Sequence, residues 1–128
     1  MRVQSGKSEV GITYTYQISE IKTIDSLFHW IEHLLKKGFA FSGNIFVLDN
    51  TKTIEQGDIA RKFSVSDELE EVKRFCLENH QDRILIDGKY GKQVLSFMIN
   101  LTDLTIQVNL WKEEVEDIRA IEQMSGLV

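Results

Sequence analysis

Apolar and polar residues alternate strictly near the start of the chain. Between Glu9 and Ser19, apolar side chains occupy every second position from Val10 to Ile18. A period of two is typical of a β-strand that buries one face, as in an antiparallel sheet that is covered on one side. The pattern therefore predicts a half-buried strand as the first clear element.

Three later segments carry apolar residues at intervals of three and four, which is typical of one face of a helix. The first runs from Ile24 to Lys37 and is followed by Gly38, a common helix terminator. The second has Ser64 and Ser66 as alternative N-caps, and the third ends at Ser125-Gly126. The apolar stripes are Ile24, Leu27, Phe28, Ile31, Leu34 and Leu35, then Leu69, Val72, Phe75 and Cys76, then Trp111, Val115, Ile118 and Ile121.

Short apolar segments between turn-forming residues predict further strands. Asp87-Gly88 and Thr102-Asp103 are expected to form hairpin turns. A two-residue turn at the second site pairs Ile99 with Ile106, and a four-residue loop shifts the pairing by two but keeps the same faces. The predicted strands are Asn44–Leu48, an optional one near Thr53–Gln56, Arg83–Asp87, Gln93–Asn100 and Leu104–Trp111.

These elements follow the order β-α-β-(β)-α-β-β-β-α in a single domain, residues 1–128. We expect an α+β fold with one largely antiparallel sheet of about four to five strands and two to three helices packed on one face. A chain of 128 residues buries enough surface to fold without disulfides or a structural metal. The single cysteine, the absence of a long apolar run and the absence of a secretory signal favour a cytoplasmic location.

One face of the predicted sheet carries side chains that are polar but uncharged. Such a face either meets solvent or binds a partner, and a second copy of the chain is one such partner. A homodimeric structural subunit that associates through this face is therefore one alternative. The face consists of Thr13, Thr15, Gln17, Ser96, Met98, Asn100, Thr105, Gln107 and Asn109.

Acidic residues gather in two of the predicted helices. The net charge of the chain is −5, which argues against a general affinity for nucleic acid. Ser66–His80 and Lys112–Val128 each contain five acidic and two basic residues. Both segments are predicted to be helical, so we expect an acidic helical surface that attracts a basic protein partner.

His29-Trp30-Ile31-Glu32-His33 matches the H-x-x-E-H pattern of inverted zinc peptidases. Two histidines four residues apart share one face of a helix and can both reach a zinc ion, and the glutamate can activate water. Here both histidines lie opposite the apolar stripe, towards solvent, and no third ligand is placed near them. A metal-binding protein or hydrolase that uses this helix is the second alternative.

Two further patterns have structural explanations. Gly88–Gly91 matches the GXXG loop of nucleotide-clamping KH domains, but it follows a strand and is expected to be a hairpin turn. Cys76 lies in an apolar stripe and is expected in the core, although His80, four residues later, is a conceivable base for a nucleophilic thiol.

No catalytic set and no cofactor motif emerges, so we expect a non-enzymatic protein-binding module without metal or cofactor. An immunity protein or inhibitor that neutralises a basic partner fits this description, and neither nucleic acid nor membrane is expected as a partner. The candidate partner-binding residues are two aromatics at exposed or boundary positions and four helix carboxylates. They are Trp30, Glu70, Glu71, Tyr90, Glu113 and Glu116.

Overall fold

The computed structural model describes residues 2–8, 11–38, 43–51, 58–90, 93–111 and 118–127. Its strands are β1 (Arg2–Ser8), β2 (Gly11–Tyr16), β3 (Asn44–Leu48), β4 (Ile59–Ser64), β5 (Arg83–Tyr90), β6 (Gln93–Asn100) and β7 (Thr105–Trp111). Its helices are α1 (Ile24–Lys36), α2 (Leu69–Glu78) and α3 (Ile118–Ser125). Within these described ranges, no helix is long and apolar enough to cross a membrane.

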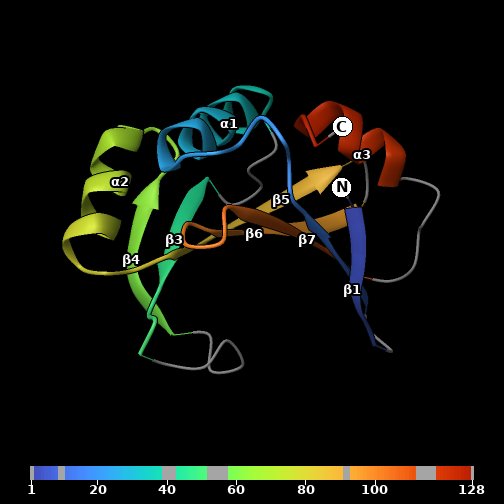
Figure 1. Ribbon diagram of the computed structural model, residues 1–128, viewed down its shortest axis with the longest axis horizontal. Helices are drawn as coiled ribbons and strands as arrows, with labels where there is room; N and C mark the ends of the chain where they lie inside the picture. Colours follow the sequence, from blue (N-terminus) through green and yellow to red (C-terminus); the bar gives the residue numbers. More distant parts are fainter. Residues whose placement is uncertain are drawn as a thin grey trace.

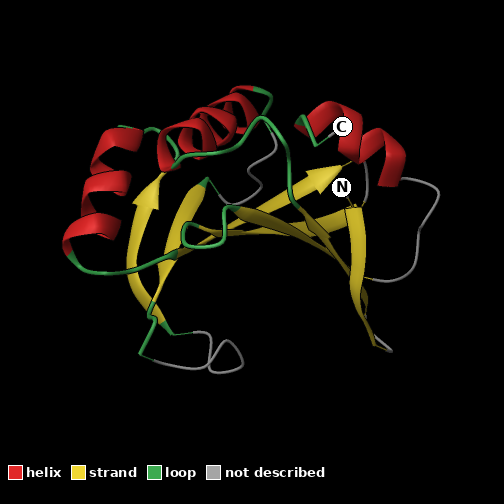
Figure 2. Ribbon diagram, in the orientation of Figure 1, coloured by secondary structure: helices red, strands yellow, loops and turns green. Residues whose placement is uncertain are grey.

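The strands form a single antiparallel sheet in the order β1-β2-β7-β6-β5-β3-β4. All three described helices lie on the same side of this sheet (Figures 1 and 2). The predicted α+β class, with helices on one face, is therefore confirmed. The sheet has seven strands rather than four to five, because β1 and β4 add a strand at each edge.

The register of the β6–β7 hairpin is one of the two that the sequence leaves open. Ile99 pairs with Ile106, and the regular pairing ends at Asn100 and Thr105. The prediction of a hairpin turn at Asp87-Gly88 is wrong. Both residues continue β5, where they pair with Ser96 and Leu95 of β6. A glycine has no side chain to pack, but its backbone can still form the hydrogen bonds of an antiparallel ladder.

Several predicted boundaries shift in the structure. The optional strand near Thr53–Gln56 lies outside the described residues, and β4 begins later, at Ile59. The prediction that Ser64 or Ser66 caps the second helix is wrong. The N-cap of α2 is Glu68 without a side-chain hydrogen bond, while the two serine hydroxyls bond each other in the preceding turn at 2.8 Å.

Helix α1 begins and ends as its sequence predicts. The Thr23 side chain accepts a hydrogen bond from the backbone N–H of Ser26, and the Ser26 hydroxyl accepts one from the backbone N–H of Thr23. This reciprocal capping box satisfies two N–H groups that the first turn leaves without helical partners. After the last turn, Gly38 adopts a φ of +76°, a left-handed conformation that glycine adopts without a steric penalty.

The core lies between the helices and the covered face of the sheet. Leu27, Ile31 and Leu34 of α1 are completely buried or nearly so, and each such side chain contributes about 1.5–3 kcal/mol through its removal from water. The apolar stripe of α1 is thus used for packing, which turns its opposite, polar face towards solvent. Trp111, which the sequence placed both at the end of a strand and in the apolar stripe of the last helix, ends β7, and α3 begins at Ile118.

Candidate functional site

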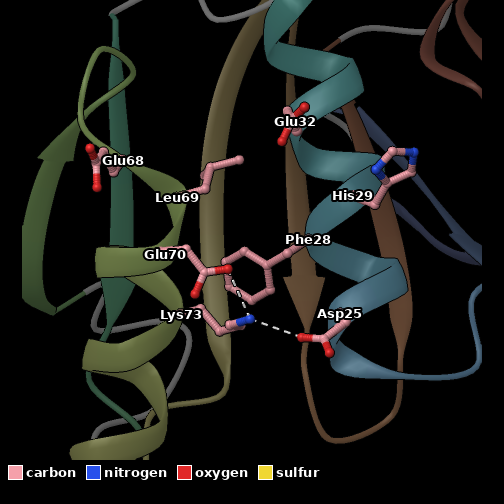
Figure 3. Close-up of a pocket in the computed structure, with 8 residues that line it drawn as sticks. All are labelled: Asp25, Phe28, His29, Glu32, Glu68, Leu69, Glu70 and Lys73. Carbon is pink, nitrogen blue, oxygen red and sulfur yellow. Dashed lines mark hydrogen bonds and ion pairs between the residues drawn. The ribbon is translucent and has the colours of Figure 1, made fainter.

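An open groove of about 540 Å³ separates the polar side of α1 from the beginning of α2 (Figure 3). Each helix supplies half of its lining because the two helices lie side by side on the sheet (Figure 1). The lining is dominated by carboxylates and includes only one lysine. The eight lining residues are Asp25, Phe28, His29, Glu32, Glu68, Leu69, Glu70 and Lys73.

The spacing along α1 explains why its polar residues reach the same groove. Asp25, His29 and Glu32 are separated by four and three residues, so they stack on one face of the helix. Phe28, between them, is buried, and its ring extends between the two helices in Figure 3. The groove therefore combines an apolar floor with an acidic wall.

Lys73 connects the two helices across the groove. Its ammonium Nζ lies 2.9 Å from Asp25 Oδ1 of α1 and 3.1 Å from Glu70 Oε1 of its own helix. The Lys73 side chain is 20% exposed, whereas those of Asp25 and Glu70 are 82% and 78% exposed. Hydrogen bonds to Asp25 and then to Glu70 raise the pKa of Lys73 above its usual value, so the lysine is positively charged at neutral pH.

Glu32 is paired outside the groove. Its Oε1 accepts a hydrogen bond of 2.9 Å from Lys36 Nζ, one helical turn later. This hydrogen bond, with the charge of Lys36, lowers the pKa of Glu32 below its usual value. Glu32 therefore remains a carboxylate at neutral pH, and the four carboxylates that line the groove outnumber its single ammonium group.

The geometry of this site is suited to binding a positively charged group. The groove is open to solvent, and its carboxylates project into water. Such groups attract and orient a positively charged partner.

The predicted metal motif does not assemble a metal site. His29, Glu32 and His33 are all exposed on α1, and only His29 and Glu32 line the groove. Among the residues that the structure describes, no group of three or more histidine, cysteine, aspartate or glutamate side chains is placed to hold a metal ion. A tetrahedral zinc site needs such a convergence.

The six predicted partner-binding residues have different positions. Glu70 lines the groove, whereas Glu71 is exposed on the same helix outside it. Trp30 is only 6% exposed and packs edge-on against Phe97 at a ring separation of 6.0 Å, so the structure corrects its expected boundary position to a core position. Tyr90 ends β5, and its side chain lies outside the described residues, as do Glu113 and Glu116.

Three important groove residues were not among the predicted site residues: Asp25, Glu68 and Lys73. The sequence indicated a polar face of this helix, with His29 and His33 opposite the apolar stripe and Asp25 one turn before His29. Nothing in the sequence, however, indicated that α2 lies beside this face, because that proximity depends on the order of the strands beneath the helices. Lys73 is one of two basic residues in an acidic helix, and the sequence gives no sign of its contact with Asp25.

Cys76 occupies the predicted core position. It is 1% exposed, and burial, together with the nearby charge of Asp82, raises the pKa of the thiol to about 11. A nucleophilic cysteine needs the opposite shift, because the thiolate is the reactive form. The hypothesis that His80 activates this thiol therefore receives no support from its surroundings.

Comparisons of the chain with protein-family models, with curated proteins and with solved structures found no match.

Proposed function

We propose that this chain is a non-enzymatic binding module that recognises a basic protein through the groove between α1 and α2. The observation that carries this proposal is the charge of the lining, in which four carboxylates face one lysine. Such a groove favours a lysine or arginine side chain of the partner over an acidic one and accelerates encounter with a basic surface.

The apolar floor adds a second component of recognition. Buried Phe28 and half-buried Leu69 lie beside the carboxylates. Lysine and arginine both combine an apolar stem with a charged head. A partner side chain of this type would place its stem against the floor and its charge between the carboxylates, as the Lys73 ammonium group lies between Asp25 and Glu70 within the chain.

The proposed class of function is inhibition or immunity, in which a small acidic protein neutralises a basic partner in the cytoplasm. Binding alone suffices for this role, and the groove offers binding groups rather than a catalytic set. The size of the groove, about 540 Å³, accommodates one or two side chains. The rest of the interface would extend over the exposed faces of the two helices.

Affinity capture from the source cells tests the proposal when three baits are compared. The wild-type chain is used beside a groove variant, Glu68→Gln with Glu70→Gln, and a control variant, Glu78→Gln with Asp103→Asn. Both variants lose two negative charges, but the control residues are exposed positions that do not line the groove.

We expect wild type and control to retain the same basic partner and the groove variant to lose most of it. Equal retention by all three baits would place the interface elsewhere. Thermal unfolding of each bait checks that the loss of binding does not reflect loss of the fold.

A further inference from the structure

The face of the sheet opposite the helices has no covering element among the described residues (Figure 2). The strand register places one continuous row of side chains across this face, from Thr15 on β2 through Gln107, Met98 and Leu85 to Phe46 on β3. Every member of this row is half-buried and uncharged. We call this row and its neighbouring ladder, Thr13–Asn109–Ser96, the sheet patch.

Hydrogen bonds fix the neighbouring ladder in place. Thr13 Oγ1 donates to Asn109 Oδ1 at 2.8 Å, and Asn109 Nδ2 donates to Ser96 Oγ at 3.1 Å. These side chains are therefore ordered before any partner arrives, which lowers the entropy lost on association. Next to them, Phe46, Leu85 and Met98 provide an apolar surface on three adjacent strands.

We propose that a second copy of this chain covers the sheet patch, so that two sheets pack face to face with the helices outside. This inference is independent of the proposed function, because the acidic groove lies on the opposite layer of the fold and remains accessible in such a dimer.

Charge favours a second copy as the occupant. The chain has a net charge of −5, and the groove on the helical side is acidic, so contact between two helical layers would be repulsive. The sheet patch carries no charge, and its hydroxyl and amide groups can both donate and accept hydrogen bonds. The charged residues beside it, Lys62 on β4 and Arg83, Asp87 and Lys89 on β5, include both signs, so two copies do not present a uniform like charge to each other.

The dimensions of the face are sufficient for a stable interface. Strands lie about 4.8 Å apart and rise about 3.3 Å per residue. The six strands from β2 to β4 in the sheet order, whose side chains the structure describes, have roughly six residues each and thus make a face of about 29 by 20 Å. Two such faces bury up to about 1,200 Å², which is the lower end of the range of specific interfaces. Twisted sheets that pack in this way keep their strands within about 30° of each other.

Sedimentation velocity of the full chain over a concentration series tests the proposal. We expect a species of about twice the 14.8 kDa chain mass at micromolar concentrations. Met98→Lys and, separately, Gln107→Lys each place an unpaired charge in the interface and should weaken the dimer at least about tenfold. Gln107→Lys changes a polar, half-buried side chain, so it provides a readout even where Met98→Lys impairs folding.

Leu77→Lys is the matched control, because Leu77 is an exposed apolar residue of α2 on the helical layer. This variant adds the same charge and should leave the dimer intact. The proposal is overturned by a wild-type chain that remains monomeric up to about 100 μM, a concentration at which specific interfaces of this size are occupied. It is also overturned if Leu77→Lys weakens the dimer as much as the two patch variants do.

Discussion

Lys73 of α2 donates a hydrogen bond to Asp25 of α1, with its Nζ 2.9 Å from Oδ1, and thereby ties together two helices that are 48 residues apart in sequence at this contact. The same ammonium group also contacts Glu70. Lys73 is consequently both a structural link and an internal counter-ion of the acidic groove. In this second role it competes with the cation of any partner.

Removal of this internal cation should strengthen the attraction of the groove for basic ligands. We expect Lys73→Met to raise the association rate of a labelled ten-residue oligolysine roughly two- to fivefold at low salt, because the variant frees two carboxylates and keeps an apolar stem. Stopped-flow fluorescence measures the rate. Lys37→Met removes the same charge from an exposed position at the end of α1 and should have a clearly smaller effect; equal acceleration would mean that only net charge matters.

Trp30 is expected to contribute to stability rather than to recognition. Truncation of a buried tryptophan leaves a cavity and costs about 3–5 kcal/mol, so Trp30→Ala should lower the free energy of unfolding by about that amount. Denaturant titration provides the measurement. A fall of less than about 1 kcal/mol, or a specific loss of partner binding in a variant that remains folded, would show that the side chain acts at an interface.

The Thr23 cap offers a local test of how α1 is positioned. Loss of a capping side chain costs about 1 kcal/mol, and Thr23→Ala should destabilise the chain by this amount, whereas Thr23→Ser keeps the accepting hydroxyl and should be nearly neutral. Thermal unfolding of the pair gives the comparison. Equal destabilisation by both substitutions would mean that the threonine methyl group, rather than the hydrogen bond, matters.

Cys76 should make stability depend on pH in the alkaline range. Burial raises the pKa of its thiol from 9.0 to about 11 in the folded state, so the folded state holds this proton more tightly than the unfolded state. The contribution of the Cys76 thiol to the free energy of unfolding is therefore fully present below about pH 9. It is lost as the pH rises towards 11. Denaturant titrations across this window should show a decline that Cys76→Ala reduces; an identical decline in the variant would assign the effect to other groups.

The sequence predicted the fold class because its periodicities are local and strong. The alternation in β2 and β7 and the stripe of α1 each record one buried face. The same alternation limits the β6–β7 hairpin to registers that keep apolar residues facing each other, and the pairing of Ile99 with Ile106 is one of the two considered. β4 escaped prediction because four of its six residues are exposed, as an edge strand permits. Asp87-Gly88 was misassigned because a dipeptide typical of turns can also continue a strand when its neighbours pair.

The site was less predictable than the fold for a physical reason. An acidic helix was visible in the sequence, and Glu70 was correctly placed on an accessible surface. The partner wall of the groove comes from α1, and its position depends on long-range strand order, which periodicity does not encode. Trp30 illustrates the same limit, because an aromatic residue at the margin of a helical stripe is buried only if another element, here the strand that carries Phe97, approaches it.

The most direct test of the central claim is the association rate between the captured partner and the chain at low salt. We expect Glu68→Gln with Glu70→Gln to slow association at least about tenfold and Glu78→Gln with Asp103→Asn to leave the rate nearly unchanged. Equal rates for the two double variants would contradict the proposal that the groove between α1 and α2 receives a basic partner.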